Sequence, residues 1–277
     1  MITKTLRRRW LYPVLSITMA AGICFGQPLV AQALNWGDLI RGGIQIIQGI
    51  QLTRLSDSQE ADLGRQINDE LTSSGQARLV NDPALTAYVN QIGQKLVPNS
   101  DRPNIPYKFQ VVDDKSINAF ATMGGYVYVN RGLLTAADNE AQVAGVIGHE
   151  MGHIAGKHAL RQMRQTAIQQ GLLAAGGLDR NTAVNLGVQV ALRLPNSRQD
   201  EYEADQRGLR TMSRAGYAQS EMVAFMRKLL NSASPPTFLA NHPATSDRIV
   251  RLNQLISQNP SPGRAGTDSA SYRARLR

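Results

Sequence analysis

The spacing of apolar residues after residue 55 predicts two amphipathic helices. Ser56 and Gln59 form a capping-box pattern, and Asp82-Pro83 combines an N-cap residue with proline at the first helical position. Behind each start, apolar residues recur at helical spacing, which places them on one face. They are Leu63, Ile67 and Leu71 in the first helix and Leu85, Tyr88, Val89, Ile92 and Leu96 in the second. We expect both helices to serve as scaffold.

The pattern then changes to alternation, which is typical of strands. Tyr107, Phe109 and Val111 alternate with polar residues, and a second extended run leads from Ile117 through Gly124-Gly125 to Tyr126–Val129. The two runs predict a small antiparallel sheet of at least one hairpin. A glycine pair within a strand pattern indicates a bulge or a point where another backbone approaches closely.

Helical spacing returns after residue 138. Asp138 can cap a helix that begins near Asn139, and the Ala-, Gly- and Leu-rich residues 165–194 predict a helical hairpin or an insertion. Ser197 with Asp200 resembles another capping box, opening a helix that ends at Gly216. Further helices are expected over residues 219–231 and 245–257. Together these patterns predict an α+β fold that is predominantly α-helical.

The first 55 residues look like a targeting segment followed by an amphipathic segment. Residues 1–33 combine a basic stretch, an apolar run and Ala31-Gln32-Ala33, which is the pattern of a secretory signal peptide. A retained membrane anchor is the alternative, because the apolar run is long enough to reach across a bilayer. Residues 34–55 form a glycine-weakened amphipathic segment that packs on the body or rests on a membrane.

Composition and charge exclude further classes of protein. The 277 residues are 42% hydrophobic and 18% charged, which excludes a disordered chain. Of the net charge of +9, residues 1–33 carry +4 and residues 260–277 carry +3, so the rest of the chain is nearly neutral at +2. This distribution argues against nucleic-acid binding and predicts that residues 259–277 form a disordered basic tail. The lone Cys24 lies in the predicted signal, which leaves the exported chain without thiol chemistry.

The pentad His149-Glu150-Met151-Gly152-His153 carries the candidate chemistry. On a helix, the i, i+4 spacing stacks the two imidazoles on one face, where both can bind a single Zn²⁺. Glu150 projects beside that face and can act as general base without ligating the metal. The alternative is an amphipathic helix with two exposed histidines, but the helix around the pentad is apolar enough to be buried.

A third ligand must come from elsewhere in the chain. His158 lies one residue short of the position in the HExxHxxGxxH pattern, and on a continuing helix it would turn about 100° away from the metal. We therefore interpret His158 as a surface or capping residue. Glu201 and Asp205 share a helix face, so one can ligate while the other accepts a hydrogen bond from a ligand histidine. Glu203 is the rival candidate for the third ligand. The non-functional alternative is that these acidic residues form a solvated helix start, stabilised by the helix dipole.

Three ordered motifs resemble one protease family. They are the pentad at 149–153, Glu201-Tyr202-Glu203-Ala204-Asp205, and Asn241-His242-Pro243 followed by Arg248. Residues 56–258 are thereby similar to the gluzincin-type zinc metallopeptidase domain of the family that contains the HtpX, CAAX prenyl, OMA-type and BepA proteases. Asp138–Ala141 and Asn118-Ala119-Phe120 also resemble family sequence.

The resemblance implies a zincin-like fold and a set of residue roles. His149, His153 and Glu201 would bind one Zn²⁺, Glu150 would be general base and acid, and Asp205 would support a ligand. His242 would lie over the metal, as a transition-state donor or an inhibitory extra ligand, supported by Arg248. The family's edge strand for extended substrates corresponds to Gly124, Gly125 and Tyr126, with Asn118 and Ala119 nearby. We expect neither the transmembrane helices nor the TPR domain that some members of this family have, so the resemblance implies no substrate class.

These observations predict an exported zinc metalloendopeptidase of the periplasm or cell envelope. We expect its substrates to be unfolded or misassembled envelope proteins, because strand addition selects extended chains. Contact with a membrane and with envelope assembly machinery stays open. The alternatives are a zinc-containing chaperone with a His242-capped, latent site and a membrane-surface adaptor with a relic site. The intact Glu150 argues against a relic.

Overall fold

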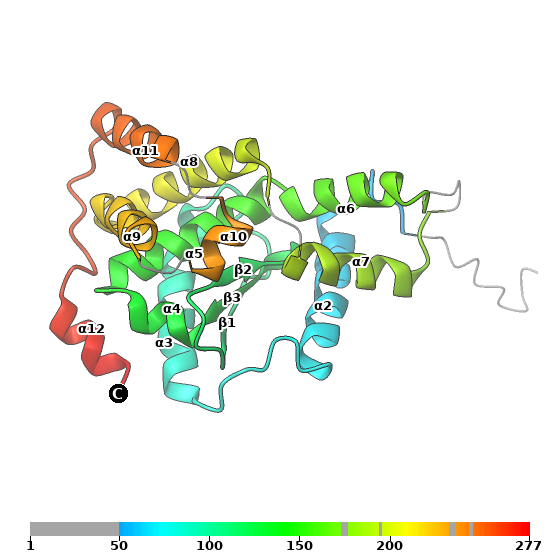
Figure 1. The fold of residues 1–277 in the computed structure, drawn as a ribbon, viewed down its shortest axis with the longest axis horizontal. Coiled ribbons are helices and arrows are strands. Elements are labelled where there is room, and N and C mark those ends of the chain that lie inside the picture. The colour runs from blue at the N-terminus through cyan, green and yellow to red at the C-terminus, as the bar shows by residue number, and fades with distance from the viewer. Residues whose placement is uncertain (1–49, 173–176, 194–195, 233–235, 244–245) are drawn as a thin grey trace, which may run out of the picture. The chain divides into compact units, whose positions relative to one another are not determined.

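The computed structural model describes residues 50–172, 177–193, 196–232, 236–243 and 246–277. Sixteen elements follow one another in this part of the chain, and the helices α2 to α12 dominate it (Figure 1). The helices are α2 (Asp57–Ser73), α3 (Pro83–Leu96), α4 (Arg131–Ala136), α5 (Glu140–Ala155), α6 (His158–Gln169), α7 (Arg180–Arg193), α8 (Arg198–Arg214), α9 (Ser220–Leu230), α10 (Thr237–Asn241), α11 (Ser246–Gln258) and α12 (Ser269–Arg275), with 3-10 turns η1 (Val97–Asn99) and η2 (Met123–Gly125). The strands are β1 (Lys108–Val112), β2 (Ala119–Ala121) and β3 (Tyr126–Asn130). The predicted α+β, mainly helical class is confirmed.

Local sequence signals account for most helix starts. Ser56 and Gln59 form both hydrogen bonds of the capping box, and the side chains of Asp82 and Ser197 accept from the third backbone N–H of their helices. Each cap satisfies a donor that the helix itself leaves unpaired. The cap of α5 lies one residue later than expected, because Asn139 rather than Asp138 accepts from the Gln142 N–H.

The sheet is mixed rather than wholly antiparallel, which corrects one expectation. Its strand order is β1-β3-β2, with β1 parallel to β3 and β2 antiparallel to β3. The η2 turn separates β2 from β3, and a Cβ on Gly124 would lie 2.9 Å from the backbone of Ala61 in α2. The predicted close approach of another backbone at the glycine pair is therefore confirmed. The glycine pair lies in a turn between two strands.

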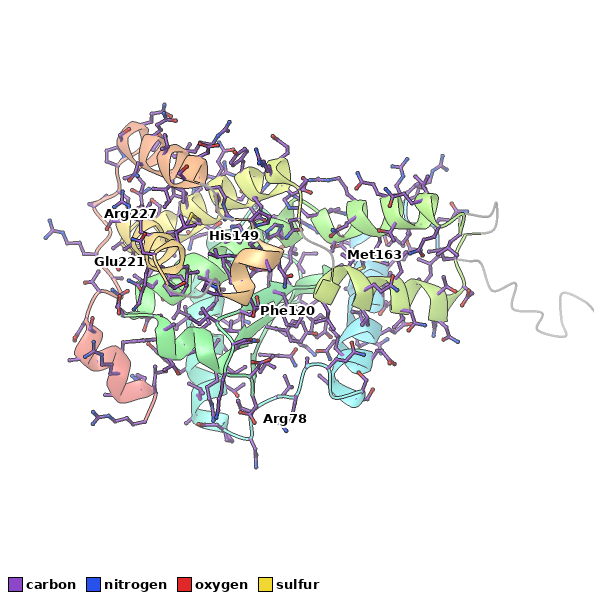
Figure 2. The ribbon with its side chains drawn as sticks, in the orientation of Figure 1. Arg78, Phe120, His149, Met163, Glu221 and Arg227 are labelled. Carbon is purple, nitrogen blue, oxygen red and sulfur yellow. The ribbon has the colours of Figure 1, made fainter. Side chains whose placement is uncertain are left out.

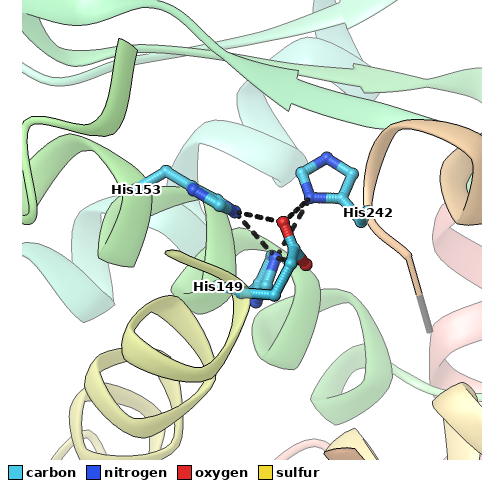
Figure 3. Close-up of side chains that lie close together, drawn as sticks. His149, His153 and His242 are labelled. Carbon is cyan, nitrogen blue, oxygen red and sulfur yellow. Dashed lines mark hydrogen bonds and ion pairs between the residues drawn. The ribbon is translucent and has the colours of Figure 1, made fainter. Parts of the chain in front are cut away.

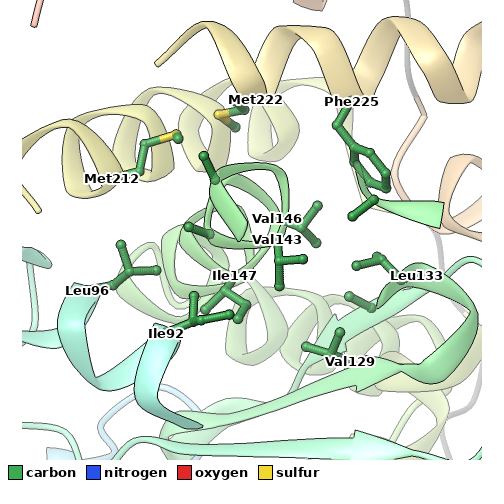
Figure 4. Close-up of a cluster of buried hydrophobic side chains, with 14 of the residues drawn as sticks. Ile92, Leu96, Val129, Leu133, Val143, Val146, Ile147, Met212, Met222 and Phe225 are labelled. Atoms are coloured by element: carbon green, nitrogen blue, oxygen red, sulfur yellow. The ribbon is translucent and has the colours of Figure 1, made fainter. Parts of the chain in front are cut away.

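Both faces of the sheet are covered, so every residue of β3 is buried. Val127 and Val129 face a cluster built on α3, α5, α8 and α9, whereas Tyr126 and Tyr128 face a second cluster with α2, α6 and α7. Figure 4 shows part of the first cluster around α5, and Figure 2 places Phe120 and Met163 of the second cluster where the sheet meets α6 and α7. The alternation of Tyr and Val in β3 thus divides two cores.

The C-terminal residues are ordered, contrary to the predicted disordered tail at 259–277. The Ala265 N–H donates to the Gly216 carbonyl, and the Ala141 N–H donates to the Gly266 carbonyl. In α12, Tyr272 is 2% exposed and its hydroxyl donates to the Leu134 carbonyl at 2.6 Å. One buried aromatic ring and a few backbone hydrogen bonds hold a segment whose composition is otherwise typical of disorder.

The N-terminal predictions fall largely outside the described residues. The signal peptide at 1–33 and residues 34–49 of the amphipathic segment lie there. Of the rest, Ile50 forms a bridge with Leu178 and Leu52 is buried in the second cluster, so this part packs on the body. The predicted helical hairpin at 165–194 corresponds to α6 and α7, which both contribute to that cluster. Within the described residues, no helix has the length and apolarity to cross a membrane.

Candidate metal centre

Helix α5 presents His149 and His153 in the interior of the molecule. Its residues from Ala141 to Ile154 are all buried, between the sheet and helices α3, α8 and α9. The Nε2 atoms of the two histidines lie 3.0 Å apart, as expected for one helix face at i, i+4. The exposed-histidine alternative is therefore wrong.

Helix α8 crosses α5 at very short range and brings Glu201 to the same point. A Cβ on Gly152 would lie 2.6 Å from the Ala204 carbonyl oxygen, and one on Gly208 would lie 2.7 Å from the Gly148 carbonyl carbon. Only glycine permits backbones this close. The Glu201 side chain is fully buried, and its carboxylate oxygens lie 3.4 Å and 3.3 Å from Nε2 of His149 and His153.

A fourth donor atom comes from the segment after α10. His242 Nδ1 lies 3.2 Å from His149 Nε2 and 3.2 Å from a Glu201 oxygen, so that three imidazoles and one carboxylate converge (Figure 3). All four donor atoms lie within 4.8 Å of one another. Zinc bonds of about 2.0–2.1 Å in a tetrahedron require donor separations of about 3.3–3.4 Å, so the cluster has the dimensions and donor types of a zinc site.

Charges in the cluster also suit a metal. Burial lowers the pKa of His153 to about 3, which keeps its imidazole neutral. Burial opposes the charge on His149 as well, but Glu201 and Asp205 outweigh it and raise the pKa of His149 to about 9. The pKa of Glu201 is held well below its usual range, since the neighbouring His242 and His149 outweigh the cost of its burial. A metal binding here would displace a proton from His149.

Glu150 lies beside this cluster without joining it. Its carboxylate is 1% exposed, and neither oxygen has a hydrogen-bond partner among the described residues. One oxygen lies 3.4 Å from His242 Nε2, and burial raises the pKa of the carboxyl group. An unpaired buried carboxylate is costly, which is the signature of a group kept for chemistry rather than for stability.

Asp205 and Arg248 support the cluster on the side of His149. His149 Nδ1 lies 2.9 Å from one Asp205 oxygen, and Arg248 donates to both Asp205 oxygens at 2.7 and 2.6 Å. Another Arg248 nitrogen lies 2.6 Å from Glu201 Oε2, and the whole side chain is 1% exposed. The guanidinium is thus committed to two carboxylates. It therefore connects Asp205 with Glu201 of the donor cluster.

His158 is the residue that sequence reasoning placed wrongly. Helix α5 ends at Ala155, Lys157 is left-handed with φ of 53°, and a new helix begins at His158. The side chain is 1% exposed, and its Nδ1 lies 2.7 Å from His153 Nδ1. It is therefore neither a surface nor a capping residue. The rotation of 100° holds only for a continuous helix, and Gly156, which follows Ala155 as the C-cap of α5, is the sequence signal that could have indicated the break.

The predicted substrate-binding residues lie along the segment that contains β2, the η2 turn and the start of β3. Tyr126 begins the central strand β3, so the expectation that it lies on an edge strand is wrong. Gly124 and Gly125 belong to the η2 turn and are buried. Ala119 begins β2, directly after Asn118, and β2 is an edge of the sheet and packs against α5. The edge next to the metal centre is therefore β2. Glu203, the rival ligand, lies outside the cluster and contacts His158 instead.

Comparison with known proteins shows the family to which the chain belongs. The model of peptidase family M48 matches residues 83–256, more than half of the chain, and the chain belongs to this family. It is 32% identical over 222 residues to the beta-barrel assembly-enhancing protease of Escherichia coli (strain K12), an alignment covering 73% of this chain and 45% of that protein. It therefore spans less than half the length of that relative.

Two further relatives are metalloproteases by name. The chain is 30% identical over 172 residues to the mitochondrial metalloendopeptidase OMA1 of Saccharomyces cerevisiae, covering 58% of this chain and 50% of that protein. It is 28% identical over 240 residues to the metalloprotease LoiP of Escherichia coli (strain K12), covering 82% and 90%. These relatives support a metalloprotease and do not favour the chaperone alternative.

Proposed function

We propose that the protein is an exported zinc metalloendopeptidase that hydrolyses peptide bonds in unfolded or misassembled envelope proteins. The convergence of His149, His153 and Glu201 beside the unpaired carboxylate of Glu150 carries this proposal. Two imidazoles and a carboxylate leave a coordination position for the reaction, as catalytic zinc sites do.

A bound zinc ion would act as a Lewis acid that polarises the peptide carbonyl and makes water more acidic. Glu150 takes the proton from the attacking water and delivers it to the leaving nitrogen as the C–N bond breaks. Its raised pKa suits both steps, because a carboxylate that is too acidic is a weak base. Asp205 accepts from His149 Nδ1–H and keeps Nε2 of that ring free for the metal.

We propose that His242 closes the site at rest. Its Nδ1 takes the fourth corner of the donor cluster while its Nε2 faces Glu150, so it lies where water and substrate would bind. Phe238 stacks on the His242 ring at 4.5 Å, and the Phe238 N–H donates to the Ile117 carbonyl just before β2. Opening the site therefore requires α10 and His242 to move together. A displaced His242 could then donate to the oxyanion.

The edge of β2 supports recognition of extended chains. Thr122 N–H donates to Tyr126 O and Asn130 N–H donates to Asn118 O, so in this antiparallel pairing the backbone groups of Ala119 and Ala121 point away from β3. An extended substrate adding to this edge would be held through its backbone, which tolerates many side chains. The predicted signal peptide and the name of the beta-barrel assembly-enhancing relative point to envelope proteins as substrates.

Zinc analysis combined with cleavage of casein tests the proposal. We expect about one zinc per chain in the wild type and in Glu150→Gln, because Glu150 is outside the ligand set. Cleavage should fall by a factor of about 10²–10⁴ in Glu150→Gln, the usual contribution of a general base.

His242→Ala is the second variant in this experiment. We expect it to raise cleavage, because the fourth corner of the cluster becomes accessible. The proposed protease activity would be refuted if the protein binds zinc but shows no cleavage that depends on Glu150, both in the wild type and in His242→Ala. A drop in cleavage in His242→Ala would instead assign the histidine to the transition state.

A further inference from the structure

The contact between His153 and His158 joins the metal cluster to the molecular surface. The two Nδ1 atoms lie 2.7 Å apart, and the rings meet edge to face with centroids 4.8 Å apart. On its other side, His158 Nε2 lies 3.3 Å from a Glu203 oxygen and 3.8 Å from an Asp200 oxygen. An imidazole thus bridges a proposed zinc ligand and two carboxylates.

Proton positions along this bridge follow from the ligand role of His153. Its Nε2 faces the cluster, so a metal would take that lone pair and the ring's proton would stay on Nδ1. Two nitrogens 2.7 Å apart share one proton, which means that His158 Nδ1 must be the acceptor. The proton of neutral His158 then lies on Nε2, directed at Glu203.

We propose that His158 is a positioning residue that fixes the tautomer and ring orientation of His153 for zinc binding. This inference rests on the proposed zinc site. His158 is not one of the four clustered donors, and it acts through its contact with one of them, His153. It does for His153 what Asp205 does for His149, with a neutral imidazole in place of a carboxylate.

The backbone between the two histidines is shaped for this contact. Lys157 is the only non-glycine residue with positive φ in the described part of the chain, and its left-handed turn directs the chain back toward His153. Gly156 has ordinary helical angles, but a Cβ there would lie 2.1 Å from His158 Nε2. Glycine at 156 is thus needed for the space that the His158 ring fills, and not for its backbone angles.

His158, Asp200 and Glu203 could in principle hold a metal of their own, since their donor atoms lie within 4.8 Å. Arg161 argues against this. Its guanidinium lies within ion-pair distance of both carboxylates, and it also donates to the Gly156 carbonyl at 2.6 Å. The Arg161 guanidinium already neutralises Asp200 and Glu203. We therefore interpret these two carboxylates as partners of His158 and not as ligands of a second metal ion.

Nuclear magnetic resonance of the zinc-loaded wild type, labelled with 15N at histidine, tests the proton positions directly. The chain has only four histidines, so single variants assign them all. We expect His158 to be the neutral Nε2–H tautomer with a bare Nδ1. A proton on His158 Nδ1, or a charged ring, would overturn the proposal.

Zinc affinity supplies the second test, measured by competition with a chelator. His158→Leu should lose affinity about 10–100-fold, as loss of a partner of a ligand histidine usually does. His158→Asn should stay within a few fold of the wild type, because its side-chain oxygen lies as many bonds from Cα as Nδ1 does. Equal affinity in His158→Leu and the wild type would refute the role of His158. Failure of the wild type itself to bind zinc would refute the proposed function instead.

Discussion

The two histidines of the α5 pentad are supported in opposite ways. Behind His149, the carboxylate of Asp205 and the guanidinium of Arg248 form a charged pair that is almost wholly buried. Behind His153 lies the ring of His158, which in turn faces Glu203 and Asp200. The side chains of these two residues are 28% and 21% exposed. Charge is therefore held inside the protein on one side and kept near the surface on the other.

This difference has an energetic consequence. A buried ion pair costs desolvation and becomes strongly destabilising when one partner is removed, whereas exposed pairs contribute little. The His149 side should therefore couple metal binding to global stability. The His153 side should affect the metal with little effect on folding.

The largest expected effect comes from Arg248→Met. It leaves Asp205 and Glu201 as uncompensated buried carboxylates, and we expect a loss of about 3–5 kcal/mol in unfolding free energy by urea denaturation. Arg161→Met on the other side is the matched control, since this side chain is 47% exposed and its loss should cost about 1 kcal/mol or less. Equal losses in both variants would remove the distinction between the two sides.

Asp205→Asn should weaken zinc binding about 10–100-fold, because the neutral amide is a poorer acceptor for His149 Nδ1–H and no longer pairs with Arg248. Chelator competition measures the change. Asp200→Asn is the comparison on the other side, where the carboxylate lies 3.8 Å from His158, and it should leave affinity nearly unchanged. A larger loss of zinc affinity in Asp200→Asn than in Asp205→Asn would contradict the stronger role that we assign to the His149 side.

Gly156→Ala should lower zinc affinity through displacement of the His158 ring, with a smaller loss of unfolding free energy than Gly152→Ala gives, because the displaced atom is the end of a side chain and not backbone. Gly152→Ala is the matched change one turn earlier. There the new Cβ meets the Ala204 backbone at 2.6 Å, so helix α8 must shift and stability should fall clearly. Unchanged zinc affinity in Gly156→Ala would contradict the importance of the His158 position.

The smallest effect concerns acid stability. Burial of Asp200 opposes its charge, but hydrogen bonds from Arg161 and Ser197 outweigh it and hold the pKa of Asp200 below its usual value. A lowered folded-state pKa contributes stability above the unfolded pKa near 4 that is lost as pH falls further. Asp200→Asn should therefore flatten the urea stability profile slightly between pH 5 and 3. The same substitution at the exposed Asp62 is the control, and an equal flattening there would show that the partners of Asp200 contribute nothing.

Much of the fold was predictable because its signals are local. The capping box at Ser56, the N-cap at Ser197 and the helical spacing of apolar residues depend on neighbours within a few positions. The strand order was not predictable, because Tyr126–Val129 has the same alternation whether the strand is central or at an edge. The C-terminal tail was predicted wrongly because Tyr272 finds its buried position only against α4, far away in the sequence.

The sequence by itself determined the ligands that one helix can present. Spacing at i, i+4 places His149 above His153, and it places Glu201 above Asp205, wherever those helices lie. Only the tertiary structure decided which groups stand behind them. A left-handed Lys157 turned His158 inward, and glycine contacts between α5 and α8 set the distance to Asp205. The spacing of residues along the sequence describes the faces of one helix. Which side chains contact a proposed metal ligand depends on how separate segments pack together, and this packing leaves no repeating pattern in the sequence.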